Sequence, residues 1–149
     1  MKKNREIELM ARGVCVVMGQ LLLCRTKGAN LTYLPGGHVE FHEPARESLR
    51  REIAEELGLK STVGRFLGAV EHTYTRKGVR SCEINLCFEV KIRGLSAGVP
   101  PPSMEDYIRF EWMPLRNLAR SDLEPGELKR MLKAWMRPAP VDRWASTYD

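Results

Sequence analysis

A stretch of 23 residues places three carboxylates and an arginine on one predicted helix between two glycines, and it constrains the fold more than any other feature. Its spacing is Gly37-x5-Glu43-x7-Arg51-Glu52-Ile53-x-Glu55-Glu56-x-Gly58-Leu59. A helix turns about 100° per residue, so Glu52, Glu55 and Glu56 fall within roughly 100° of one another. Three acids on one stripe repel each other unless a cation lies among them. Acids alone would also fit a solvated helix face, but the flanking glycines and proline favour a cation site.

The same segment has an apolar face that predicts how the helix packs. Apolar residues recur every four positions, which is typical of a helix with one buried stripe; they are Ala45, Leu49, Ile53 and Leu57. Pro44 suits the first helical position, and Gly58 suits a left-handed cap. The sequence therefore predicts a helix over about 44–57, with a core on one side and a cation on the other.

The acidic pattern matches, at every defined position, the signature box of the Nudix hydrolases, so the chain resembles that family and its MutT-like members. The resemblance covers about residues 10–136. It implies an α/β/α sandwich with a mixed β-sheet between helices. It also implies hydrolysis of a nucleoside diphosphate linked to another moiety, by attack of water on phosphorus. The substrate stays open among a nucleoside triphosphate, a dinucleoside polyphosphate and a nucleotide sugar.

The resemblance also implies a metal-ligand set on this helix. Glu55 and Glu56 would be the central ligands, Glu52 a further ligand or the base, and the carbonyl of Gly36 an additional ligand. The expected cofactor is Mg²⁺, with Mn²⁺ as an alternative, because hard divalent cations prefer carboxylate and phosphate oxygens. Such an ion neutralises phosphate charge and acidifies bound water.

Outside the metal set, two box residues and a loop acid have expected roles. Arg51 would hold Glu43 and a neighbouring carboxylate through charge-assisted hydrogen bonds. Family members commonly add an acid before a late strand that carries a tryptophan, here Trp112. Glu105 is favoured as this extra ligand or base, and Asp106 is a close second. Two solvated loop acids are an equal alternative, and Glu71 and Glu83 are held in reserve.

Substrate contacts are less constrained by the sequence. Arg25 stands where the family often uses an arginine that contacts phosphate, although an ordinary surface arginine is equally compatible. Tyr74 stands where relatives that cleave ADP-ribose usually carry proline, and a tyrosine near there occurs in dinucleoside polyphosphate hydrolases. His72, close by, could reach the substrate cleft.

The remaining elements follow from apolar alternation and from turn residues. We expect a hairpin of strands 14–18 and 21–24, a strand at 39–41, one or two strands over 62–75 with a kink near Gly68, and strands at 82–90 and 108–113. A mobile loop over 94–103, a helical turn at 114–119 and a second helix opening at Pro125 complete the expected order. The tail 137–149 is expected to be disordered or to dock on a partner subunit, as in a homodimer.

Composition narrows the classes of protein. A chain of 149 residues fits one domain, here 1–149. The net charge of +5 is dispersed, which is compatible with a phosphorylated small-molecule substrate or with an ordinary solvated basic surface and makes nucleic acid an unfavoured partner. The sequence contains no run of 18 apolar residues, so no membrane-spanning helix is predicted. The cytoplasm is therefore the expected compartment. The four cysteines lack CxxC spacing and are expected to be buried free thiols. A nucleotide- or RNA-sensing module of the same fold, without catalysis, is the alternative function.

Overall fold

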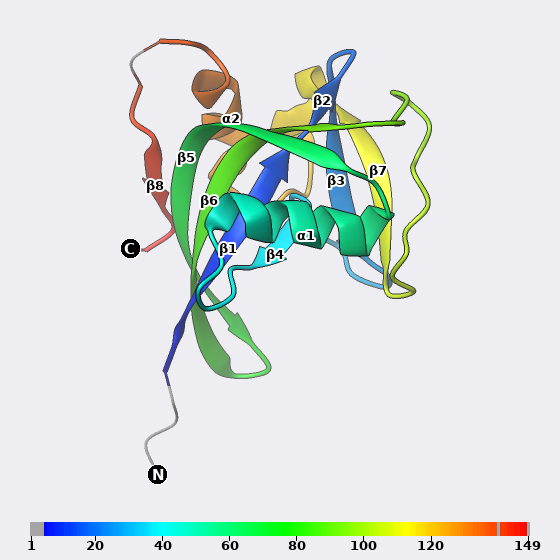
Figure 1. Ribbon diagram of the computed structural model, residues 1–149. Helices are drawn as coiled ribbons and strands as arrows, with labels where there is room; N and C mark the ends of the chain where they lie inside the picture. The colour runs from blue at the N-terminus through cyan, green and yellow to red at the C-terminus, as the bar shows by residue number, and fades with distance from the viewer. Residues whose placement is uncertain (1–4, 140, 149) are drawn as a thin grey trace.

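The computed structural model describes residues 5–139 and 141–148, and its strands form two sheets (Figure 1). The larger sheet has the order β4 (Gly36–His38), β1 (Ile7–Val14), β6 (Val79–Ile92), β5 (Ser61–Arg76), β8 (Trp144–Ser146). The smaller has the order β2 (Val16–Val17), β3 (Gln20–Thr26), β7 (Ile108–Pro114). The β1–β6 and β5–β8 pairs are parallel and the others antiparallel, so the larger sheet is mixed.

Two α-helices lie on opposite sides of the strands, α1 (Ala45–Leu57) in front and α2 (Leu128–Trp135) behind them in Figure 1. A 3₁₀ helix, η1 (Leu115–Arg120), follows β7. Pro44 caps α1 in an extended conformation and Gly58 ends it in the left-handed region with φ 67°, so the predicted helix is confirmed to within one residue. No helix in the described ranges is long and apolar enough to cross a membrane.

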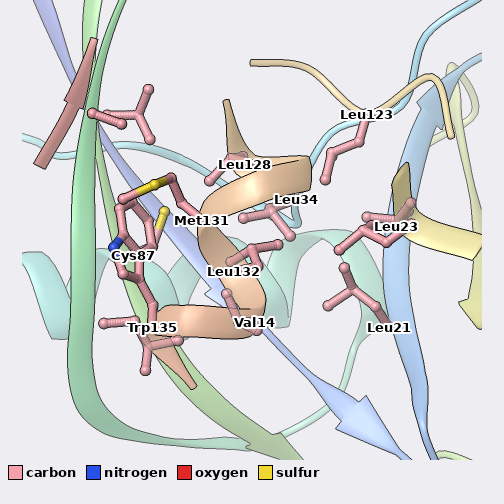
Figure 2. Close-up of a cluster of buried hydrophobic side chains, with 14 residues drawn as sticks. Val14, Leu21, Leu23, Leu34, Cys87, Leu123, Leu128, Met131, Leu132 and Trp135 are labelled. Carbon is pink, nitrogen blue, oxygen red and sulfur yellow. The ribbon is translucent and has the colours of Figure 1, made fainter. Parts of the chain in front are cut away.

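Alternation along β3 divides the interior into two cores. Leu21 and Leu23 belong to the core under α2, whereas Leu22 and Cys24 belong to the core under α1. In the first core Trp135 lies beside Cys87 of β6 and packs against Gly68 of β5, while Leu132 of α2 lies between it and Leu21 and Leu23 of β3 (Figure 2). In the second, the predicted apolar face of α1 supplies Leu49, Ile53 and Leu57. Each helix thus covers one apolar surface, and the predicted α/β/α arrangement is confirmed, with the strands shared between two sheets.

Four predicted elements differ from the structure. The short strand is Gly36–His38, not 39–41, and the side chain of Phe41 is 92% exposed. The first hairpin strand is only Val16–Val17, because the preceding residues belong to β1 in the other sheet. The second helix begins at Leu128, three residues after Pro125. The tail is neither wholly disordered nor free, because β8 pairs with residues 69–71 of β5.

Other expectations hold. A single long strand, β5, covers residues 62–75, and its pairing with β6 shifts register on either side of Phe66, close to the expected kink at Gly68. No helix or strand is assigned to residues 94–103. The strand before η1 and the helical turn itself lie where they were predicted. All four cysteines are free; three are buried and Cys82 is half-buried.

Candidate active site

Arg51 organises the acids at the polar face of α1. Its Nε lies 2.9 Å from Glu43 Oε2, and its Nη1 lies 3.1 Å from Glu52 Oε1 and 3.2 Å from Glu55 Oε1. Nη2 also donates to the carbonyl of His38 at 3.1 Å. The hydrogen bonds from Arg51, supported by one from the Ser48 hydroxyl, lower the pKa of Glu43 to about 2. The box arginine therefore fixes three carboxylates and ties the helix to the loop after β4.

The two glycines before the helix allow β4 to approach both α1 and β1. A Cβ on Gly37 would lie 2.4 Å from Cδ of Glu52, so only glycine leaves room for this carboxylate. Gly36 has φ 135°, and a Cβ there would lie 2.0 Å from the carbonyl oxygen of Ala11. The Pro-Gly-Gly entry thus makes a backbone wall against the acidic face of the helix.

On the acidic face of α1, the side chain of Glu56 is buried, and one of its carboxylate oxygens lacks a hydrogen-bond partner among the described residues. Its side chain is 7% exposed, and Oε2 accepts no hydrogen bond in the described part of the chain. Burial raises the pKa of Glu56 to about 8, and the charge of Glu52 contributes to the increase. Arg12 and the backbone N–H of Gly36 oppose that increase. A buried carboxylate oxygen without a partner is costly unless a cation or ligand completes it.

The loop before β7 brings a fifth acid to this group. The backbone N–H of Met104 donates to the Glu56 carbonyl at 2.7 Å, which fixes the loop at the end of α1. The next residue, Glu105, lies close enough for its charge to raise the pKa of Glu56, after burial and Glu52. Asp106 is exposed and contributes no such effect. Of the loop acids, the structure therefore brings Glu105 toward the site.

The two reserve acids lie elsewhere on the large sheet. Glu83 of β6 is buried and accepts a hydrogen bond from Asn85 at 3.0 Å. Glu71 lies on β5, which pairs with β6 along one edge and with β8 along the other. Its partner on β8 is Ser146. Neither carboxylate forms an ion pair or hydrogen bond with Arg51 in the part of the chain that the structure describes.

The donor set fits a hard divalent cation. No three potential ligand side chains among the described residues are already gathered around one point, because Glu52 and Glu55 point toward Arg51. The oxygen of Glu56 without a partner nevertheless lies beside an all-carboxylate group, and carboxylate oxygens are what Mg²⁺ and Mn²⁺ prefer.

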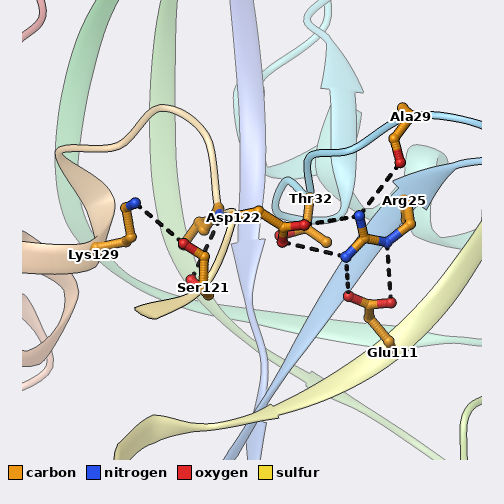
Figure 3. Close-up of polar contacts among 8 residues, drawn as sticks. Arg25, Ala29, Thr32, Glu111, Ser121, Asp122 and Lys129 are labelled. Atoms are coloured by element: carbon orange, nitrogen blue, oxygen red, sulfur yellow. Dashed lines mark hydrogen bonds and ion pairs between the residues drawn. The ribbon is translucent and has the colours of Figure 1, made fainter. Parts of the chain in front are cut away.

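Arg25 lies on the other face of β3. Its guanidinium is held between Glu111 at 2.8 Å and Asp122 at 2.9 Å, and it also donates to the Ala29 carbonyl (Figure 3). Alternation places Arg25 on the side of Leu23, whereas Cys24 belongs to the core under α1. The structure thus does not bring Arg25 together with the α1 acids, and its binding of substrate phosphate stays a prediction.

Tyr74 lies on the long hairpin of β5 and β6. Its ring stacks on His72 with centroids 5.3 Å apart, and it pairs with Ser81. The His72 ring also contacts the Thr147 hydroxyl at 2.9 Å. No contact joins either ring to the α1 acids within the described ranges, so a role for Tyr74 in substrate binding stays a prediction.

Sequence reasoning missed Arg12 of β1. Its Nε donates to Asn85 Oδ1 at 3.1 Å and its Nη1 to the Leu34 carbonyl at 3.2 Å. It is one of the two groups that lower the pKa of Glu56. A signal was present, because Arg12 is the one charged residue between Leu9 and Leu23 in an otherwise apolar, strand-like stretch.

Comparison with known proteins places this geometry in a family. The profile of the NUDIX domain matches residues 9–135. A curated relative, the putative mutator protein MutT4 of Mycobacterium tuberculosis (strain CDC 1551 / Oshkosh), is 29% identical over 92 residues, which make up 62% of this chain and 36% of that protein. The chain thus spans about a third of the length of this relative.

Solved structures share the fold at low sequence identity. The solution structure of the E. coli ORF135 protein has a TM-score of 0.69 at 22% identity, covering 93% of this chain and 96% of that chain. A MutT NUDIX hydrolase from Burkholderia pseudomallei has a TM-score of 0.66 at 23% identity, covering 91% and 100%.

The chain belongs to the NUDIX domain family, because the profile match runs from within β1 to the end of α2. Its α/β fold with a mixed sheet matches that of the two solved structures. This membership supports a hydrolase that acts on anhydride bonds in phosphorus-containing compounds, the class of reaction that the acidic box indicates.

Proposed function

We propose that the protein is a Mg²⁺-dependent pyrophosphohydrolase that cleaves a phosphoric anhydride bond in a nucleoside diphosphate linked to another moiety. The observation that carries this proposal is the buried Glu56 oxygen without a partner, beside acids that Arg51 holds in place. A merely structural acidic surface would be solvated, and it would not need an arginine with three carboxylates at its centre.

The residues divide into those that would hold the cation and those that prepare them. Glu52, Glu55 and Glu56 would bind Mg²⁺ or Mn²⁺ together with the Gly36 carbonyl. When bound, the cation supplies charge neutralisation for the phosphates and acidity for a coordinated water. Arg51 orients Glu52 and Glu55 through direct hydrogen bonds.

Two further acids complete the proposed machinery. Glu43 anchors Arg51 by two hydrogen bonds of 2.9 Å, so it acts through the arginine and not on substrate. Glu105 comes from the loop before β7, and a hydrogen bond from its neighbour Met104 to the Glu56 carbonyl attaches that loop to the end of α1. A carboxylate in that place can accept the proton of the attacking water.

The substrate is a nucleoside triphosphate, a dinucleoside polyphosphate or a nucleotide sugar, and a panel of these compounds distinguishes them. We would incubate the protein with Mg²⁺ and nucleoside triphosphates, oxidised deoxynucleoside triphosphates, ADP-ribose, sugar nucleotides and dinucleoside polyphosphates, and identify products by mass. Metal-dependent cleavage of one class supports the proposal and names the substrate. Tight binding of a panel member without cleavage would instead make the protein a sensing module.

Glu56→Gln tests the residue on which the proposal depends. We expect turnover to fall by more than the roughly 10–100-fold that is lost when an outer partner of a metal ligand is replaced. The free energy of unfolding without metal should not fall, because the amide is uncharged and close in size to the carboxyl group that it replaces. Glu47→Gln is the matched control, since Glu47 is an exposed acid of the same helix paired with Arg50. Equal turnover in the two variants would contradict the assignment.

A further inference from the structure

The guanidinium of Arg12 is held by hydrogen bonds on one side, and its other side has no hydrogen-bond partner among the described residues. Arg12 lies on β1 directly opposite Gly36 of β4. Its Nε and Nη1 are occupied by the Asn85 amide oxygen and the Leu34 carbonyl. Nη2 donates no hydrogen bond, and Arg12 forms no ion pair, in the part of the chain that the structure describes. A half-buried guanidinium with spare donors is a binding group for an anion.

A buried relay fixes the direction of this guanidinium. Asn85 is fully buried, and its amide nitrogen donates to Glu83 Oε1 at 3.0 Å. The amide oxygen must therefore face Arg12, which sets the orientation of the guanidinium without neutralising it. On another side, the Tyr33 ring lies 5.5 Å from Arg12 Cζ and limits its movement.

The guanidinium lies next to the proposed metal site. Gly36 is the β4 partner of Arg12, and the carbonyl of Leu34, two residues before it, accepts a hydrogen bond from Arg12 Nη1. Strand pairing therefore places Arg12 at the backbone wall that Gly36 and Gly37 form against the acidic face of α1.

Arg51 and Arg25 differ from Arg12, because all three guanidinium nitrogens of each donate hydrogen bonds within the protein. Arg51 is shared among three carboxylates and a carbonyl, and Arg25 is held by two carboxylates and a carbonyl. The α1 acids repel a diphosphate group, and a second cation beside the metal would reduce this repulsion further. Arg12 has the charge, the free donors and the position.

We propose that Arg12 binds a non-bridging oxygen of the substrate diphosphate through its free Nη2 side. This inference rests on the proposed function, since it needs a phosphate-bearing substrate at the α1 acids. It assigns to a residue of β1 the phosphate contact that the sequence had suggested for Arg25.

Inorganic pyrophosphate with Mg²⁺ is the probe. We expect Arg12→Gln to weaken pyrophosphate binding, measured by calorimetry, by about 10- to 100-fold, the loss typical of a hydrogen bond between charged groups. Arg12→Lys should keep part of the affinity, because lysine keeps the charge but not the planar geometry. Arg130→Gln is the control, since Arg130 is an exposed arginine on α2 paired with Glu127. Unchanged binding by a folded Arg12→Gln variant would overturn the inference.

A spectroscopic measurement on the unmodified protein covers the case in which Arg12→Gln fails to fold. The Nε–Hε resonance of Arg12, assigned by its loss in Arg12→Lys, should shift when pyrophosphate is added and not when a nucleoside is added. A shift with the nucleoside alone would mean that Arg12 contacts the base, which also overturns the inference.

The two hypotheses fail differently. If the wild type cleaves a member of the panel and Arg12→Gln has an unchanged KM, the phosphate contact is wrong and the hydrolase stands. If the wild type cleaves nothing but binds pyrophosphate through Arg12, the hydrolase is wrong and the contact stands.

Discussion

Arg51 and Arg25 are surrounded by the same chemical groups, yet their partners have different origins along the chain. Arg51 contacts Glu43, Glu52 and Glu55, all within eight residues of it in sequence. Arg25 contacts Glu111 and Asp122, which are 86 and 97 residues away. The Arg51 cluster is therefore local to α1 and its preceding loop, whereas the Arg25 cluster joins β3 to β7 and to the segment after η1.

This difference in origin indicates a difference in role. Side-chain bonds within one helix and its cap add little to the stability of a tertiary fold. Bonds between segments distant in sequence hold the packed elements together, and the side chain of Arg25 is only 15% exposed. Similar guanidinium–carboxylate clusters can thus serve catalysis in one place and folding in another.

Among the tests of this comparison between the two arginines, the largest effect is expected on activity, at Arg51. We expect Arg51→Gln to lower kcat/KM roughly 10–100-fold, because Glu52 and Glu55 lose the donor that orients them. The free energy of unfolding should change by less than about 1 kcal/mol. Steady-state kinetics on the panel substrate and urea unfolding measure the two quantities. Arg50→Gln, next to it on the same helix and paired only with Glu47, should change neither.

The opposite pattern is expected at Arg25. Arg25→Gln leaves Glu111 and Asp122 without their shared cation, and we expect a loss of about 1.5–3 kcal/mol in the free energy of unfolding. The kcat/KM of the folded variant should stay near wild type. Urea unfolding with Arg109→Gln as control, the exposed residue directly opposite on β7, gives the comparison. A raised KM with unchanged stability would instead show that Arg25 contacts phosphate.

The smallest expected effect depends on pH. Hydrogen bonds from Arg25 hold the pKa of Asp122 below its usual value, helped by the Thr32 hydroxyl. A depressed pKa in the folded state adds stability above the unfolded-state pKa, and this stability is lost as pH falls through the folded-state value. Asp122→Asn should therefore cost about 0.5–1 kcal/mol at neutral pH, and the difference should vanish in acid. A difference that persists in acid would show that the charge of Asp122 is not its source.

The helix and its acids could be predicted because their signals are local. The apolar ladder of Leu49, Ile53 and Leu57 and the cap at Gly58 lie within one segment, so periodicity and cap chemistry determine it. The contacts of Arg51 follow from the same helical spacing.

The rest depends on contacts between distant segments. Nothing near Trp144 indicates that residues 144–146 add a parallel strand to β5. The side of β3 that Arg25 occupies depends on which core Leu23 joins, which a single apolar run does not reveal. The position of Arg12 next to Gly36 follows only from the pairing of β1 with β4, although its charge stands out in an apolar stretch. Strand pairing and the side of a strand on which a residue lies are tertiary properties. They also explain why the strand predicted at 39–41 is wrong.

The division of the interior into two cores has a consequence for how such a protein can change over generations. Because β3 sends alternate residues to separate clusters, a substitution under α1 and one under α2 share few partners, so their energetic effects should add. The side that carries the acids can then drift toward a new substrate while the side around Trp135 preserves the domain. Homologous structures that keep this shape at 22–23% identity are the outcome expected of such independence.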